Sequence, residues 1–269
     1  LDDASAPDGS SDVATPDAGL NDVLDAGPID ASPLPVDCTG PSCGVSIVSG
    51  IGESFCALLQ DGSVVCWGEN DTGQLGRGPD VTEYGSATPA RVVNLPKIVR
   101  LERLCAIDEN GETWCWGIGP YLRDPSNGAT TTEPAPVKLP IAHASSVSVR
   151  SRPREYAAVA CAVADGGVLC WGSNANGQVA RPVVDDTTEN GWAPHEVVLP
   201  PGAPIRSVAV GDATFALRED GTLLSWGANP PLGRVSSLFP DFRPKPIALP
   251  NITNVDVCLD EACVVSNGA

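Results

Sequence analysis

The sequence contains no methionine, only two histidines and few aromatic residues, which make up 5% of its 269 positions. None of its apolar runs approaches the roughly 18 residues that a membrane-spanning helix needs, so no span is expected. Position 1 also lacks methionine, and no apolar signal segment is left at the start of the chain. We therefore expect a secreted protein with a processed N-terminus, although a trimmed chain would look the same.

Residues that carry catalysis or bind metals are scarce. His143 and His195 lie beside proline-rich segments, with no nucleophile and base arranged near them, and are expected to be surface or hydrogen-bonded histidines. The ten cysteines form no Cys-x-x-Cys knuckle, which argues against zinc. The sequence thus predicts a protein that is not an enzyme and has no catalytic residue, metal or cofactor.

Basic residues are outnumbered, with 16 Lys and Arg against 34 Asp and Glu, giving a net charge of −18. Nucleic acids and anionic lipid surfaces are therefore poor partners. Residues 1–37 hold nine aspartates and no lysine, arginine or glutamate, a composition typical of a self-repelling spacer. We predict two parts, an Asp/Ala/Pro-rich N-terminal segment at 1–37 and a repeat domain at 38–269.

The repeat is built on a hairpin. Two apolar runs, 55–59 and 64–67, flank Asp61-Gly62, and Asp-Gly between β-prone runs is a strong hairpin signal. Similar turns follow at Asn110, Asp165, Asp220 and Asn267, at spacings of 49, 55, 55 and 47 residues. This period is close to that of propeller blades.

Each hairpin is preceded by a proline-bracketed segment, expected to be an outer edge strand, and by an alternating strand. We therefore predict an all-β, propeller-like array of about five four-stranded blades. In the N-terminal segment, Pro33, Leu34, Pro35 and Val36 resemble the outer-strand segments. This candidate assembly strand would close or complete the array.

The cysteines indicate how the hairpins pair. Cys56 with Cys66, Cys105 with Cys115 and Cys161 with Cys170 would face each other across three hairpins. The fourth copy has Phe215 and Ser225 at these positions, and the joint loss favours three disulfides over buried free thiols. Two more close pairs, Cys38 with Cys43 and Cys258 with Cys263, have a bonding that the sequence leaves open. Ten apparently paired cysteines indicate an oxidising compartment, extracellular or at the cell surface.

The runs that start at Cys56 and Cys161 resemble the regulator of chromosome condensation repeat, in particular its cysteine-bearing bacterial form in secreted and surface proteins. The resemblance covers roughly residues 33–269. Copy two departs from it at 119–122 and copy four at 230–233, and copy five lacks its Trp-Gly strand. It implies a β-propeller, usually of seven blades, whereas this chain has four complete hairpins and one half.

Aromatic residues follow the repeat. Four tryptophans occupy one position per copy and are predicted to pack between blades: Trp67, Trp116, Trp171 and Trp226. Tyr121 and Trp192 fall outside the pattern and are candidates for a contact surface.

Two candidate functions remain, and the first rests on the half-repeat in the fifth copy. The N-terminal segment could enter the last blade of a neighbouring molecule, giving a non-enzymatic extracellular structural protein that self-assembles into a filament. Arg150, Arg152 and Arg154 alternate and could dock this segment, or could be ordinary solvated charges. The alternative function is a surface-tethered propeller that binds another extracellular protein through its blade loops. The predicted partner is thus the protein itself or another extracellular protein.

Overall fold

The computed structural model describes residues 40–81, 83–141, 143–152, 157–183, 192–258 and 261–266. The chain divides into two units, Leu1–Cys38 and Thr39–Ala269, and the structure described below belongs to the second. The predicted assembly strand at Pro33, Leu34, Pro35 and Val36 lies outside the described residues.

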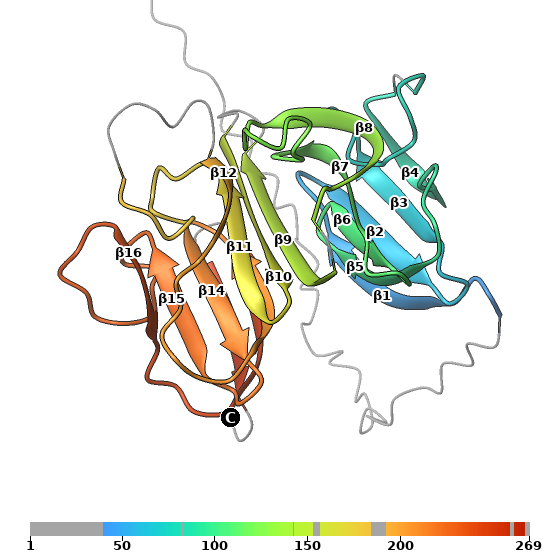
Figure 1. The fold of residues 1–269 in the computed structure, drawn as a ribbon. Coiled ribbons are helices and arrows are strands. Elements are labelled where there is room, and N and C mark those ends of the chain that lie inside the picture. The colour runs from blue at the N-terminus through green and yellow to red at the C-terminus, as the bar shows by residue number, and fades with distance from the viewer. Residues whose placement is uncertain are drawn as a thin grey trace, which may run out of the picture. The chain divides into compact units, whose positions relative to one another are not determined.

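The second unit consists of successive antiparallel sheets, one per sequence repeat (Figure 1). All regular structure in the described residues is β-strand, so the predicted all-β class is confirmed. Blade 1 contains β1 (Gly44–Ser49), β2 (Ser54–Leu59), β3 (Val64–Glu69) and β4 (Gly85–Arg91). Blade 2 contains β5 (Ile98–Glu102), β6 (Cys105–Asp108), β7 (Thr113–Gly119) and β8 (Thr131–Lys138). Blade 3 contains β9 (Ala144–Arg152), β10 (Ala157–Ala164), β11 (Gly167–Gly172) and β12 (Trp192–Glu196).

Blade 4 contains β13 (Ile205–Val210), β14 (Ala213–Arg218), β15 (Leu223–Gly227) and β16 (Asp241–Pro246). Within the described part of the chain, blade 5 has two strands, β17 (Ile252–Cys258) and β18 (Glu261–Ser266). Four blades therefore have four strands, as predicted, and the fifth has its first two. The predicted place of the proline-bracketed strand is wrong, because it pairs with the hairpin that precedes it, as β4 does with β3, and so ends a blade instead of beginning one.

The hairpin turns follow from local residue chemistry. In blade 1, Gly62 has a φ of 82°, a conformation that glycine adopts without steric cost. The Asp61 carboxylate accepts a hydrogen bond of 2.9 Å from the backbone N–H of Ser63, closing the turn. In blade 3, Asp165 and Gly166 both have positive φ, 50° and 78°, as a two-residue hairpin turn requires. These turns set the register of the strands that they join.

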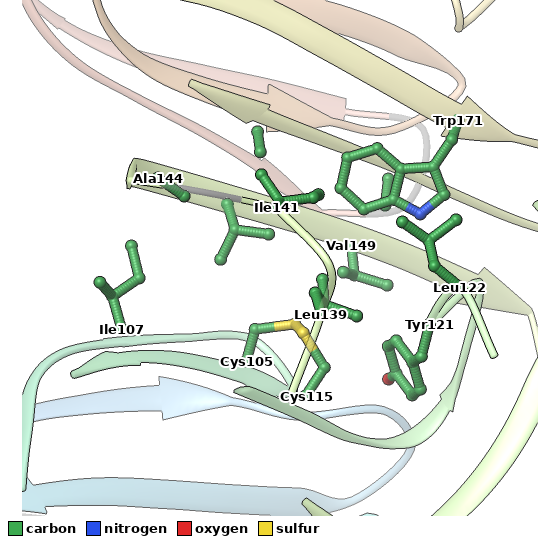
Figure 2. Packing of buried hydrophobic residues seen from close by; sticks show 13 residues of the cluster. Cys105, Ile107, Cys115, Tyr121, Leu122, Leu139, Ile141, Ala144, Val149 and Trp171 are labelled. Atoms are coloured by element: carbon green, nitrogen blue, oxygen red, sulfur yellow. A yellow bond between two sulfur atoms is a disulfide. The ribbon is translucent and has the colours of Figure 1, made fainter. Parts of the chain in front are cut away.

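Apolar side chains form one core layer between each pair of neighbouring blades. Between blades 2 and 3, the Cys105–Cys115 disulfide and Tyr121 of blade 2 face Val149 and Trp171 of blade 3 (Figure 2). Because each layer takes side chains from two sheets, the blades stabilise one another.

Candidate functional site

Three buried disulfides join the second and third strands of blades 1 to 3. They are Cys56–Cys66, Cys105–Cys115 and Cys161–Cys170, and in each the two residues are direct cross-strand partners, as the sequence predicts. These bonds lock the centre of each hairpin.

Blade 4 replaces the disulfide with a polar contact. Phe215 and Ser225 face each other at the cysteine positions. The Ser225 hydroxyl donates to the Leu232 carbonyl at 2.7 Å and accepts from Arg234 Nε at 3.2 Å. Ser225 thereby holds the loop that follows β15.

The remaining cysteines differ from one another. Cys43 is disulfide-bonded, and its predicted partner Cys38 lies outside the described residues. Cys263 is a free, exposed thiol, so the candidate disulfide between Cys258 and Cys263, which the sequence left open, is not formed. The strand register explains this, because Cys263 lies opposite Asp256 whereas Cys258 lies opposite Glu261. A disulfide across this hairpin would need the two cysteines to face each other.

Three of the four repeat tryptophans connect neighbouring blades, as predicted. The indole N–H groups of Trp116, Trp171 and Trp226 donate to backbone carbonyls of the preceding blade, at Gln74 (3.0 Å), Pro120 (2.5 Å) and Gln178 (2.7 Å). All three rings are fully buried. Trp67 of blade 1 is only half-buried and stacks on Phe55 at 6.0 Å between ring centroids.

The two aromatic residues outside the repeat pattern have different environments. Tyr121 is 1% exposed, and its hydroxyl donates to the Trp116 carbonyl at 2.6 Å, so the expectation of a contact surface there is wrong. Burial raises the pKa of Tyr121 well above its usual value. Trp192 is half-buried, with the Arg181 guanidinium 4.8 Å from its ring centroid.

An arginine recurs at one repeat position and contacts the fourth strand of its blade, and in blades 1 and 4 it also contacts the third; it was not predicted from the sequence. In each of blades 1 to 4, a buried apolar residue is followed by a residue with positive φ and then by this arginine. Arg77 donates to the Cys66 carbonyl at 3.1 Å and to the Thr88 carbonyl at 2.8 Å. The equivalent residues are Arg123, which pairs with Glu133, Arg181, which stacks on Trp192, and Arg234.

The recurring apolar-x-Arg step could have revealed these arginines. It was hidden because the sequence separation between the repeat tryptophan and the apolar residue varies: it is longer from Trp67 to Leu75 than from Trp116 to Tyr121.

Arg150 does not offer a free docking surface for the N-terminal segment. It is 7% exposed, and its guanidinium pairs with Asp212 of blade 4. The prediction failed because β9 is packed against β13, which covers this part of the strand. The side chains of Arg152 and Arg154 lie outside the described residues.

The two histidines have different environments. His143 is exposed, with a φ of 51°. His195 is half-buried, with Nε2 2.7 Å from the Val179 carbonyl oxygen, and burial lowers its pKa. Over the part of the chain that the structure describes, no three His, Cys, Asp or Glu side chains gather as metal ligands would.

The loops between the third and fourth strands, here called the outer loops, are the connections that differ most in length from blade to blade. Within the described residues they comprise 70–81, 83–84, 120–130, 173–183 and 228–240. Exposed apolar residues occur in three of them, at Tyr84, Val183 and the pair Val235 and Phe239. The outer loops are therefore the candidate binding surface.

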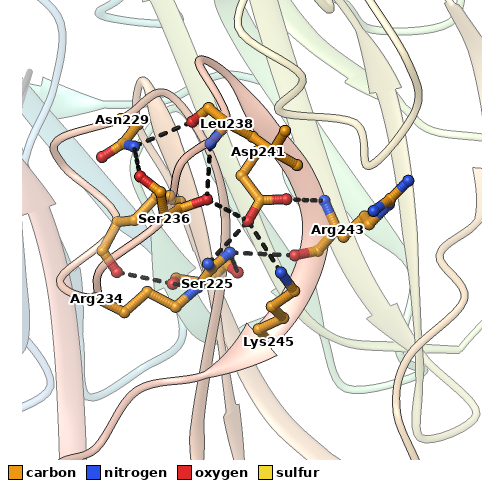
Figure 3. A network of polar contacts seen from close by, with 9 residues as sticks. Ser225, Asn229, Arg234, Ser236, Leu238, Asp241, Arg243 and Lys245 are labelled. Atoms are coloured by element: carbon orange, nitrogen blue, oxygen red, sulfur yellow. Dashed lines mark hydrogen bonds and ion pairs between the residues drawn. The ribbon is translucent and has the colours of Figure 1, made fainter.

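A buried carboxylate organises the outer loop of blade 4 (Figure 3). Asp241 accepts hydrogen bonds of 2.9 Å from Arg234 and from the Ser236 hydroxyl, and its side chain is fully buried. Burial alone would raise the pKa of Asp241, but the hydrogen bonds from Arg234, Ser236 and the Arg243 backbone outweigh it and lower the pKa to about 2. The carboxylate is thus charged at neutral pH.

Known proteins resemble this chain in sequence. Two family models, both for the regulator of chromosome condensation (RCC1) repeat, match residues 61–102 and 165–217 in one case and 45–74 in the other. The ultraviolet-B receptor UVR8 of Arabidopsis thaliana is 29% identical over 199 residues, 71% of this chain and 43% of the receptor. The E3 ubiquitin-protein ligase HERC2 of Homo sapiens is 27% identical over 205 residues, 73% of this chain and 4% of the ligase. The chain thus spans less than half of either relative.

Solved structures show the same fold. Human WBSCR16 superposes with a TM-score of 0.63 at 20% identity, over 80% of this chain and 57% of that one. Yeast RCC1 (Prp20), solved bound to Kap60, superposes with a TM-score of 0.58 at 24% identity, over 79% and 51%. The blades of this chain are therefore those of a β-propeller. The matching family models thus show that residues 45–102 and 165–217 of this chain are similar to the regulator of chromosome condensation (RCC1) repeat.

Proposed function

We propose that this chain is a protein-binding β-propeller module without catalytic activity of its own, and that it works outside the cell or at the cell surface. Propellers of the same fold bind proteins: yeast Prp20 has been solved bound to Kap60 and described for its binding to Gsp1p and histones. Those partners belong to Prp20, and the partner proposed here is an extracellular protein.

The observation that carries the proposal is the contrast between framework and loops. The disulfides, tryptophans and arginines recur from blade to blade and stabilise the sheets. The outer loops differ in length and expose apolar side chains such as Tyr84 and Phe239. Variable loops on a rigid scaffold are where binding residues concentrate.

The disulfides support the proposed location. Three buried cystines in one chain are typical of proteins that fold in an oxidising compartment. No helix among the described residues is long and apolar enough to cross a bilayer.

The test uses surface extracts and culture medium of the source organism. The chain and a variant with all four outer loops replaced by Gly/Ser segments of equal length are each cross-linked to these mixtures, and the products are identified by mass spectrometry. We expect one or a few proteins that cross-link to the native chain and not to the variant. Equal products from both chains would refute binding through the outer loops.

A second candidate is the self-assembling structural protein, in which residues 1–37 bind a neighbouring molecule. Its specific support is the exposure of apolar residues on blades 1 and 5. Val45 and Ile47 of β1 and Val264 and Val265 of β18 are exposed, and in the described residues β18 pairs only with β17. Such surfaces bury readily against added strands or blades.

Light scattering after size exclusion separates the two candidates. Self-assembly predicts that the intact chain forms multimers whose mass rises with concentration, and that a chain lacking residues 1–37 stays monomeric. A monomeric intact chain would remove this candidate and leave the binding module.

A further inference from the structure

The outer loop of blade 4 places three apolar side chains in solvent within five residues. Val235 is 102% exposed, Phe239 is 73% exposed and Leu238 is 38% exposed. Single exposed apolar residues are ordinary, but a cluster of large ones marks an interaction site. We call Val235, Leu238 and Phe239 the apolar tip.

The loop beneath the apolar tip is fixed by hydrogen bonds on both sides (Figure 3). The Asn229 side-chain amide donates to the Ser236 and Leu238 carbonyls, each at 3.0 Å. The Ser236 hydroxyl donates to Asp241 and accepts from the Leu238 N–H at 3.2 Å. The tip therefore projects from a loop whose conformation is already determined.

The base of the loop is attached to the sheet and to the neighbouring blade. Arg234 donates to the carbonyls of Ser225 on β15 and Arg243 on β16, both at 3.2 Å. A Cβ at Gly177 of blade 3 would come within 3.0 Å of the Phe242 Cβ, so the start of β16 lies directly against that blade. The loop is therefore already ordered when a partner binds. Because binding does not have to restrict its conformation, an exposed side chain on it can contribute more to affinity.

The exposed charges on β16, the strand that begins two residues after the apolar tip, are positive, although the whole chain is strongly acidic. Arg243 and Lys245 are exposed on β16, and Arg243 lies over the Phe242 ring at 5.4 Å. Asp241, the acidic residue among them, is buried and pairs with Arg234 at 2.9 Å, and the half-exposed Lys245 reaches the same carboxylate at a longer 3.4 Å. A partner with an apolar pocket rimmed by carboxylates would match this surface in both polarity and charge.

We propose that the apolar tip is the anchor by which this propeller binds its partner, and that the partner is a folded protein with an apolar pocket rimmed by Asp and Glu. This inference rests on the proposed function and assigns it to one blade. Phe239 and Val235 enter the pocket, and Arg243 and Lys245 contact its rim.

The test uses binders selected against the whole surface of the chain, with no loop favoured in the selection. A synthetic single-domain antibody library is panned on the full chain, and each clone is measured against the native chain and the V235S/F239S variant. Anchors dominate interface energy, so we expect most clones to lose at least about 30-fold in affinity. The matched control is V99S/V198S, which removes two exposed apolar residues outside the outer loops and should change affinity by less than about threefold.

Two further measurements test the assigned chemistry. R243A/K245A should slow association of the tip-binding clones, and more so at low salt, because rim charges act mainly on association. Native melting temperatures for the tip and rim variants would show that the losses are local, as their exposure predicts.

The outcomes distinguish this inference from the proposed function. If most clones bind V235S/F239S as tightly as the native chain, blade 4 is not the anchor. If replacing a different outer loop abolishes binding instead, the anchor lies in that loop and the proposed binding function stands. If no outer loop matters, both fail. If light scattering shows self-association that V235S/F239S abolishes, the occupant is a second copy and the proposed partner is wrong.

Discussion

The Cys161–Cys170 disulfide offers the sharpest test of how the framework is stabilised. The bond closes a hairpin with a sequence separation of 9, and both cysteines are fully buried. Loop-closure entropy for a loop of this length is worth about 2.6 kcal/mol at 25 °C. Each alanine also removes one buried sulfur, which adds roughly 0.5 kcal/mol at about the value of a buried methylene or less. C161A/C170A should therefore lower the free energy of unfolding by about 3 to 4 kcal/mol.

The assay is thermal unfolding followed by circular dichroism. For a chain of this size, the loss corresponds to a fall of roughly 6 to 16 °C in melting temperature. C263A is the matched control, because Cys263 is free and exposed and its removal should cost less than about 0.5 kcal/mol. A melting temperature for C161A/C170A within about 2 °C of the native value would refute the reasoning.

Three other predictions follow from the contacts between strands and blades. W171F should lower the free energy of unfolding, measured in urea, by about 2 to 4 kcal/mol, because it removes the 2.5 Å hydrogen bond to the Pro120 carbonyl and leaves a cavity. W67F is the control, and because Trp67 is only half-buried it should lower this free energy by less than half as much. R234K should lower the free energy of unfolding by about 2 to 3 kcal/mol, because lysine lacks the planar guanidinium that contacts β15, β16 and Asp241 at once. A loss below about 0.5 kcal/mol would contradict this role. Because the pKa of Asp241 is lowered to about 2, the stability that its charged form contributes is present above about pH 4 and is lost as the pH falls towards 2. The melting temperature should therefore fall less steeply with acid in D241N than in the native chain, and parallel curves would contradict this.

Much of the framework was predictable because its signals are local. Asp-Gly and Asn-Gly between β-prone runs fix the hairpins, and the hairpin register fixes which cysteines face each other. The loss of both cysteines from the fourth copy could be understood from the sequence, and Phe215 does face Ser225.

The failed predictions depended on contacts between distant residues. Tyr121 looked like an outlier because the outer loop of blade 2 is short, yet it fills the buried position that Leu75 fills in blade 1. Arg150 alternates like a surface residue, but a neighbouring blade covers it. The register of β17 and β18 separates Cys263 from Cys258, which sequence spacing alone did not reveal.

The apolar tip was also invisible in the sequence, for a different reason. A Val-Ser-Ser-Leu-Phe segment can be a buried strand as readily as an exposed loop. What exposes it is the set of bonds that Asn229, Arg234 and Asp241 make beneath it, and these join residues on both sides of the loop.

The claim that a rigid framework presents the apolar tip can be measured directly by ¹⁵N relaxation of the backbone amides of residues 235–239. Fixed backbone gives order parameters of about 0.85, and flexible loops fall below about 0.6. The bonds around Ser236 and Asp241 predict values near those of β15 and β16. Values below about 0.6 in the native chain would contradict the account.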